Sequence, residues 1–212
     1  MFVTFDIKIG NKEMFNDFLV LGKDIFSKNQ KDVHNTLEEY LLNDEIIDGD
    51  AIITNEKNVP LVILTADCVP VILVDTENKA VGLAHAGWRG TYGKICEETL
   101  KSMQENYNTN PENVIAIIGP SIGSCCYEVS YDLIDKFEKL LPNADEKIYE
   151  IRDEKYYLNL WEVNTQILKE FGVLKSNIIN MNICTSCNCD RFFSYRKHEK
   201  TPKRIGTFIE IK

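Results

Sequence analysis

Residues 61–86, LVILTADCVPVILVDTENKAVGLAHA, decide the fold of this chain. Two runs rich in Val, Leu and Ile stand at 61–65 and 69–74, and a third, KAVGLAHA, follows the polar segment DTENK. Short apolar runs bounded by polar residues are typical of buried strands. The last two runs therefore predict a β-hairpin that turns at Thr76 and Glu77.

Further strands are predicted on both sides of this hairpin. Residues 2–9 alternate apolar and polar side chains with period two, which indicates a half-buried strand. Short apolar runs predict the others, which are AIIT, NVIAII, NIINMNI and IGTFIEI.

Apolar residues at helical spacing predict three helices after the hairpin. They cover 91–107, with Thr91 as a plausible N-cap, 130–141 and 160–171, the last closed by Gly172. The stretch from the first strand to about residue 43 favours helix in parts. Because strands and helices alternate without a fixed order, we expect an α+β fold with mixed rather than purely parallel sheets.

The composition is that of an ordinary globular protein. The 212 residues are 44% hydrophobic and 27% charged, and no Pro/Gly/Ser-rich linker divides them, which predicts one domain over residues 1–212. No apolar run approaches about 20 residues and the first ten residues lack a basic lead, so we expect a cytoplasmic protein without a membrane partner. The net charge of −9 disfavours nucleic acid as a partner. Residues 191–204, with six Lys/Arg and one Glu, are either a solvated basic loop or a local anion site.

Cys68 and His85 stand at equal distances from the predicted turn. Residues equidistant from a hairpin turn lie opposite each other and project from the same face, so we expect these side chains to meet. A thiol beside an imidazole favours either a nucleophile with its base or half of a metal site. A buried cysteine beside a hydrogen-bonded histidine is the alternative without function.

A third ligand would favour metal binding, and only His34 and His198 remain among the three histidines. His198 lies among Lys and Arg residues, which disfavour a cation, whereas His34 lies in DVHNT before the strand-rich section. His34, Cys68 and His85 would leave the fourth tetrahedral position of zinc to water, as in catalytic zinc sites. We therefore expect zinc as the cofactor.

The remaining cysteines give weaker signals. Cys184 and Cys187 have the C-x-x-C spacing of metal ligands, with Cys189 two residues further on, but they lack a second pair. Cys125 and Cys126 are adjacent, and adjacent cysteines rarely bind one tetrahedral ion or each other without strain. Since no export signal is present, we expect reduced thiols that pack in loops against the core.

Four motifs resemble the laccase-domain family: TADCVPVIL, AHAGWRGT, IGPSIGSCCYEV and CTSCNCDRFFSYR, in that order. Members of this family were named multicopper polyphenol oxidases, and they include the bacterial peptidoglycan editing factor. Better-supported family activities are phosphorolysis of purine nucleosides (adenosine, inosine, guanosine and methylthioadenosine) and hydrolytic deamination of adenosine. The resemblance implies a layered fold of mixed sheets flanked by helices, related to cysteine-hydrolase toxins.

The resemblance also assigns site residues. The metal-binding His, Cys and His of the family match His34, Cys68 and His85, the residues chosen above on independent grounds. Only 33 residues precede His34, several tens fewer than in most members, so we expect a shortened N-terminal region that lacks part of the substrate pocket.

The activity implied by the resemblance is that of a zinc-dependent purine nucleoside phosphorylase with adenosine deaminase activity. Zinc could lower the pKa of its water to around 7, which suits deamination at purine C6. Phosphorolysis needs a held phosphate, and Arg89 and Arg196 are candidates because a guanidinium binds phosphate through two bonds. Ion pairs with carboxylates are their structural alternative. Trp88 and Phe193 could stack on a purine or pack in the core.

Three other interpretations follow from the same residues. Three histidines are too few for the copper sites of a multicopper oxidase. A metal-free Cys68–His85 hydrolase or amidase, including one with a role in editing peptidoglycan precursors, is the enzymatic alternative. A non-catalytic binding protein stabilised by zinc is the third. Asp67 could orient a metal ligand or act as acid or base, but strand alternation points it away from Cys68 and equally favours a structural role.

Overall fold

Buried strands form the centre of the computed structural model, which describes residues 2–9, 12–21, 49–144 and 146–212. Five of them make a sheet in the order β11-β7-β5-β6-β3, in which only the β11–β7 pair is parallel. The strands of this central sheet are β3 (Ala51–Thr54), β5 (Val69–Asp75), β6 (Ala80–Ala86), β7 (Val114–Ile118) and β11 (Ile178–Asn180). All five fall on predicted strands, and the mixed α/β architecture predicted from the sequence is confirmed.

A second sheet is antiparallel throughout, in the order β1-β2-β12-β4. Its strands are β1 (Phe2–Ile9), β2 (Lys12–Leu21), β4 (Leu61–Thr65) and β12 (Ile205–Ile209). The prediction of helix in parts after the first strand is wrong for β2. The dipeptide Gly10-Asn11 stands between the two strands in the sequence and is typical of a β-hairpin, which was the available signal for β2. Residues 22–48, which include His34, lie outside the described residues.

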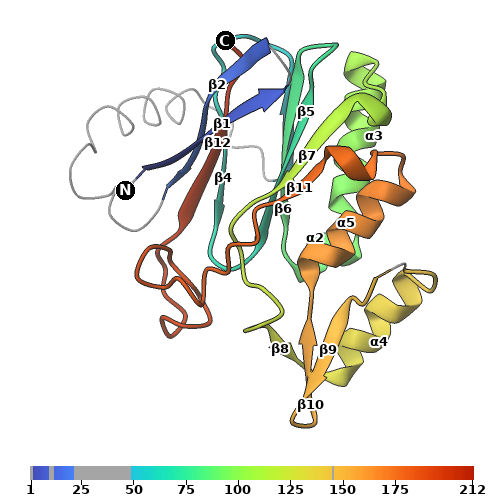
Figure 1. Cartoon of the computed structure of the whole chain (residues 1–212), viewed down its shortest axis with the longest axis vertical. Helices are drawn as coiled ribbons and strands as arrows, with labels where there is room; N and C mark the ends of the chain where they lie inside the picture. Colours follow the sequence, from blue (N-terminus) through green and yellow to red (C-terminus); the bar gives the residue numbers. More distant parts are fainter. Residues whose placement is uncertain (1, 10–11, 22–48, 145) are drawn as a thin grey trace.

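A small third sheet, in the order β8-β10-β9, lies beside α4 at one end of the molecule (Figure 1). It consists of β8 (Glu128–Val129), β9 (Tyr149–Arg152) and β10 (Lys155–Leu158). The sequence did not predict these strands, because EV, YEIR and KYYL include charged residues and form no apolar run.

The described residues include four α-helices and two 3₁₀ turns. They are α2 (Trp88–Tyr92), α3 (Ile95–Tyr107), α4 (Tyr131–Leu140), α5 (Leu160–Glu170), η2 (Pro111–Asn113) and η3 (Lys175–Asn177). The predicted N-cap at Thr91 is wrong: the helix expected from there is two helices, separated at Lys94, whose φ is 55°. Thr91 lies inside α2 and donates its hydroxyl to Ala86 O at 3.0 Å. Gly172, at φ 112°, follows the end of α5 as predicted.

The inner strands β5, β6 and β7 of the central sheet are buried on both faces. Val71 and Leu73 of β5 pack with the helices, whereas the alternate residues Ile72 and Val74 pack with Leu61 of β4 and Ile205 of β12. Figure 1 shows the resulting layers, with α3 and α5 on one side of the central sheet and β4 and β12 on the other. Burial on both faces explains why the sequence of β5 is continuously apolar instead of alternating.

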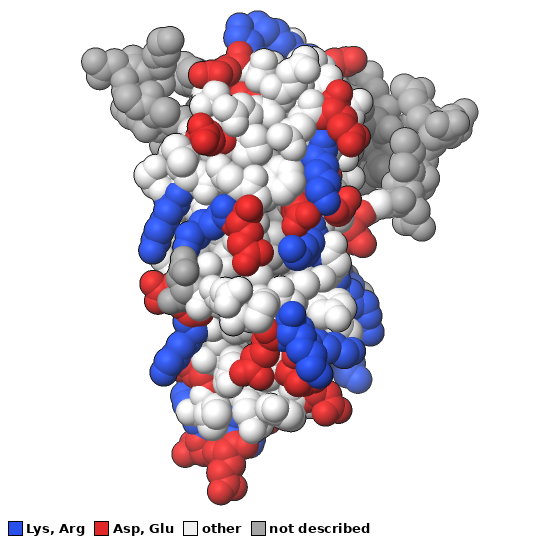
Figure 2. All heavy atoms as spheres, turned by 90° about the vertical axis from the view of Figure 1, so that its right-hand side faces the viewer, with Lys and Arg blue, Asp and Glu red and all other residues white. Residues whose placement is uncertain are grey.

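The helix-covered face carries charges of both signs. Figure 2 shows Lys and Arg side chains interspersed with Asp and Glu over this face. Among the described helices, none combines the length and apolarity that a bilayer span requires.

Candidate functional site

The β5–β6 hairpin brings Cys68 and His85 together, with a register that differs from the prediction. Pro70, not Cys68, pairs with His85, so the pairing is shifted by two residues. The cause is the turn, where Asp75 Oδ1 accepts from the backbone N–H groups of Glu77 and Asn78 and moves its centre one residue along the chain. A shift of two residues keeps side chains on the same face, so Cys68 and His85 still lie on one face of the hairpin as expected.

Gly87 marks the place where the two side chains converge. A Cβ on this glycine would lie 3.0 Å from Cys68 Sγ and 3.8 Å from His85 Nε2. Sulfur and imidazole nitrogen therefore border one small space, which only a residue without a side chain leaves open.

The other imidazole nitrogen of His85 faces a carboxylate. His85 Nδ1 lies 3.6 Å from Asp50 Oδ1, and the backbone N–H of His85 donates to Asp50 O at 2.7 Å. A carboxylate at Nδ1 leaves Nε2 free to bind a metal ion, which is the usual arrangement of a ligand histidine. The sequence analysis did not single out Asp50; its position directly before β3, the strand that pairs with β6, was the available signal.

Burial moves the pKa values of the pair in opposite directions. Burial, followed by the charge of Asp67, raises the pKa of the Cys68 thiol, and burial lowers the pKa of His85 against the opposing effect of Asp50. Arg204 lowers both values. The protein alone thus favours a neutral thiol beside a neutral imidazole, whereas a cysteine nucleophile needs the pKa of its thiol lowered.

Asp67 anchors the backbone next to Cys68. Its carboxylate is 8% exposed and accepts three hydrogen bonds, from Thr185 Oγ1 at 2.6 Å, Ser194 Oγ at 3.0 Å and the backbone N–H of Arg196 at 2.7 Å. With its acceptor positions used in this way, Asp67 holds the 185–196 loop against the end of β4. The contacts support the structural interpretation of Asp67.

Arg89 and Trp88 form the start of α2. The guanidinium of the exposed Arg89 lies 4.2 Å from the centre of the Trp88 ring, and Lys136 Nζ approaches the same ring at 5.7 Å. The half-buried Trp88 packs against the core between the sheet and the helices. Among the salt bridges of the described residues, none involves Arg89.

Tyr127 is influenced by both cationic residues, Arg89 and Arg196, and by Cys68. Burial raises its pKa to about 12, with smaller opposing effects from the charges of Arg196 and Arg89 and a raising effect from Cys68. Arg196 lies 5.4 Å from the Tyr127 ring centre and donates to Glu128 O at 3.0 Å. Tyr127 belongs to the IGPSIGSCCYEV motif, yet sequence reasoning did not assign it to the site.

The basic segment contributes Arg204 as well as Arg196. Both Cys68 and His85 experience the charge of Arg204, which the sequence analysis also missed. Phe193 is only 4% exposed and packs between the two large sheets, so its ring offers no open face to a substrate.

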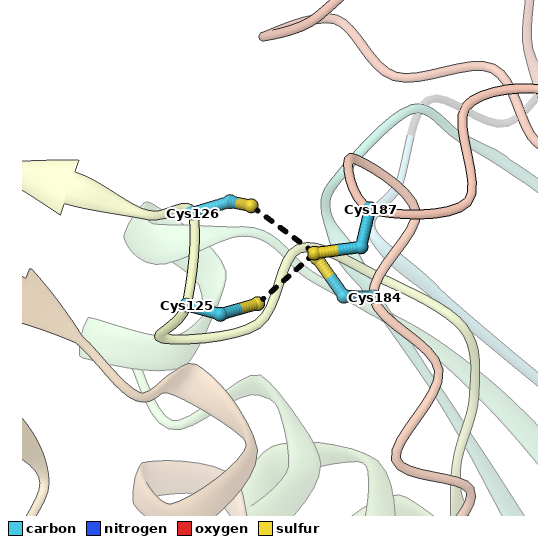
Figure 3. A group of neighbouring side chains, drawn as sticks. All are labelled: Cys125, Cys126, Cys184 and Cys187. Atoms are coloured by element: carbon cyan, nitrogen blue, oxygen red, sulfur yellow. Dashed lines mark hydrogen bonds between the residues drawn. The ribbon is translucent and has the colours of Figure 1, made fainter.

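A second group of residues lies close enough together to hold a metal ion. It is the thiol cluster, formed by the Sγ atoms of Cys125, Cys126, Cys184 and Cys187, which all lie within 4.8 Å of one another (Figure 3). The second pair that the C-x-x-C motif lacks in sequence is therefore Cys125 and Cys126. The sequence predicted loop thiols that pack against the core, and it did not predict that these four thiols lie together.

Comparison with known families identifies the fold as that of the laccase-domain class. A family model described as "Multi-copper polyphenol oxidoreductase laccase" matches residues 11–212, and this chain belongs to that family.

Among curated relatives, "Purine nucleoside phosphorylase YlmD" of Bacillus subtilis (strain 168) is 37% identical over 77% of this chain and 59% of its own length. "Purine nucleoside phosphorylase" of Bacteroides thetaiotaomicron is 40% identical over 79% of this chain and 63% of its own length. The chain thus spans about 60% of these relatives.

Solved structures agree with the fold. A Neisseria meningitidis protein covers 100% of this chain and 99% of its own at a TM-score of 0.80 and 24% identity, which supports the fold alone. YlmD from Geobacillus stearothermophilus covers 77% of this chain and 61% of its own at a TM-score of 0.73 and 37% identity.

Proposed function

We propose that this protein is a zinc-dependent purine nucleoside phosphorylase that also deaminates adenosine. The convergence of Cys68 Sγ and His85 Nε2 at Gly87 carries the proposal, because a thiol and an imidazole that border one small space are donor types that zinc takes. Relatives at 37% and 40% identity are named purine nucleoside phosphorylases, which supports the same activity class.

The described residues fit a zinc site. Cys68 and His85 supply a thiolate and an imidazole, and Asp50 at His85 Nδ1 directs the other ring nitrogen towards the sulfur. His34, which lies outside the described residues, is the third ligand of the proposal. When bound, zinc would supply a Lewis acid and an activated water.

Phosphorolysis needs a phosphate held near C1′ of the nucleoside while the purine base leaves. Arg89 and Arg196 are proposed to bind this phosphate through paired hydrogen bonds. The charges of both guanidinium groups act on Tyr127, on which Cys68 acts as well. Trp88 is proposed to contact the base, whereas the burial of Phe193 favours its packing alternative.

The test is to incubate the full chain with adenosine, inosine or guanosine, with and without inorganic phosphate, and to identify products by mass. Phosphate-dependent release of the free base with ribose 1-phosphate supports phosphorolysis, and inosine formed from adenosine without phosphate supports deamination. Absence of both products from zinc-loaded protein would overturn the proposal. Cys68→Ala and His85→Ala should each abolish both reactions, while circular dichroism confirms the fold.

Arg89→Ala separates the two reactions. Loss of charge-assisted hydrogen bonds worth about 1.5–3 kcal/mol each should weaken apparent phosphate affinity about tenfold to a hundredfold. Deamination should lose much less, because it uses water in place of phosphate. Arg89→Lys should recover part of the loss, and Lys139→Ala, which removes a surface charge on α4, is the matched control. Equal losses in both reactions would instead indicate that Arg89 orders the shared site.

A further inference from the structure

Two loops that are distant in sequence meet at the thiol cluster. Cys125 and Cys126 follow β7, and Cys184 and Cys187 lie between β11 and β12. Cys187 Sγ is 3.5 Å from Cys125 Sγ and 3.4 Å from Cys126 Sγ, and Figure 3 shows the sulfurs pointing toward one another. The cluster contains no residue of the proposed catalytic site.

The separations fit one tetrahedral ion. Zinc–sulfur bonds of about 2.3 Å in tetrahedral geometry place four sulfurs about 3.8 Å apart. The observed contacts of 3.4 and 3.5 Å and the outer limit of 4.8 Å bracket this value. Small rotations of exposed side chains suffice to equalise them, since Cys125 and Cys187 are exposed.

The backbone already holds both loops in place. The N–H groups of Cys126 and Tyr127 each donate to Gly123 O at 3.0 Å, and this turn directs adjacent cysteines to one side. Ser121 and Cys184 pair as an isolated parallel bridge, which aligns the second loop with the first. The strain expected for neighbouring cysteines is thus offset by a turn that the fold supplies.

The surroundings suit a thiolate site. The backbone N–H of Gly123 donates to Cys184 Sγ at 3.3 Å, a contact of the kind that orients metal-bound sulfur. Four thiolates carry more negative charge than a divalent ion neutralises. The guanidinium of Arg152, which donates to Ser124 O directly before Cys125, places a positive charge beside the cluster.

We propose that Cys125, Cys126, Cys184 and Cys187 bind one zinc ion in a closed structural site, separate from the catalytic zinc of the proposed function. Each thiol releases its proton to solvent and donates an electron pair to the ion, with no change in oxidation state. Four protein ligands leave no position for water, so the site stabilises the fold without performing catalysis.

The zinc would connect the loops that support the catalytic site. The loop with Cys184 continues to Ser194 and Arg196, which bind the Asp67 carboxylate beside Cys68. The loop with Cys125 begins at Ile122, whose N–H donates to Asp67 O at 2.9 Å. Loss of this ion should therefore loosen both loops at once.

Metal analysis of the full chain, purified in reductant without chelator, tests the proposal. We expect two zinc ions per chain in the wild type and one in each of Cys187→Ala and Cys68→Ala. Cys189→Ser, which changes a cysteine of the same loop outside the cluster, is the matched control and should retain both. In cobalt-loaded Cys68→Ala protein, the remaining ion should give the visible spectrum of tetrahedral cobalt with strong thiolate charge-transfer bands, and Cys126→Ser should remove it.

The outcomes separate this proposal from the catalytic one. A Cys187→Ala protein with the full metal content of the wild type would overturn the structural site and leave the catalytic zinc intact. Loss of zinc in Cys187→Ala but none in Cys68→Ala would overturn the catalytic zinc and support the structural site. A metal-free cluster with a mass lower by two hydrogens would reveal a disulfide through Cys187 and also overturn the proposal.

Discussion

Replacing Asp67 with Asn tests whether this buried carboxylate holds the loop beside Cys68. The amide oxygen can still accept from Thr185, but the new NH₂ group faces the N–H of Arg196, which at 2.7 Å from Oδ2 then lacks an acceptor. Hydrogen bonds to charged groups contribute about 1.5–3 kcal/mol, and a buried donor left unpaired costs about 1–3 kcal/mol. We expect the free energy of unfolding to fall by roughly 2–4 kcal/mol in total.

Thermal unfolding followed by circular dichroism measures this loss. For a chain of this length, each kcal/mol lowers Tm by about 2–4 °C, so the expected decrease is about 4–16 °C. Thr185→Val removes one donor and leaves two, and it should cost less than Asp67→Asn. Asp135→Asn breaks an exposed ion pair with Lys139 and should change stability by no more than about 1 kcal/mol. Equal Tm values for Asp67→Asn and Asp135→Asn would refute the anchoring role.

Three further changes test the site and the core. Gly87→Ala places a methyl group 3.0 Å from Cys68 Sγ, so zinc content and turnover should fall while Tm changes little; unchanged metal binding would contradict the convergence of the ligands. Asp50→Asn removes the charge at His85 Nδ1 and should weaken zinc affinity about tenfold to a hundredfold, measured by competition with a chelator. An unaltered affinity would show that the Asp50 carboxylate does not support His85 as a ligand. Leu100→Ala opens a cavity in the fully buried core beside the central sheet, and it should lower the free energy of unfolding by denaturant by about 2–5 kcal/mol without changing metal content. A decrease under about 1 kcal/mol would mean that the core collapses around the cavity.

Much of the central sheet could be predicted because its inner strands are buried on both faces. Val71 to Val74 of β5 and Val114 to Ile118 of β7 are apolar without interruption. The register of the hairpin was missed because Asp75 bonds two backbone N–H groups in the turn, a local contact that strand symmetry ignores. The break at Lys94 was missed because the apolar spacing continues through it.

The site was only partly accessible from the sequence. Cys68 directly precedes β5 and His85 lies on its partner strand β6, so counting from the turn brought them together. Asp50, Tyr127 and Arg204 come from three separate segments, and only the folded chain places their charges or rings near the cysteine. The thiol cluster was missed for the same reason, since the spacing of Cys184 and Cys187 gives no information about a pair 58 to 62 residues earlier in the chain.

The bonds of Asp67 also determine when the site can form during synthesis. Its carboxylate binds groups 118, 127 and 129 residues further along the chain, so the loop beside Cys68 stays without its partners until Thr185, Ser194 and Arg196 have left the ribosome. Contacts of such high sequence separation are slow to close, because a long segment must lose its freedom first. A nascent chain that ends before Thr185 already contains every strand of the central sheet, yet its Asp67 lacks all three donors. Formation of the loop beside Cys68 is thereby linked to synthesis of residues 185–196, and a chain terminated before them would carry Cys68 without the contacts that position it.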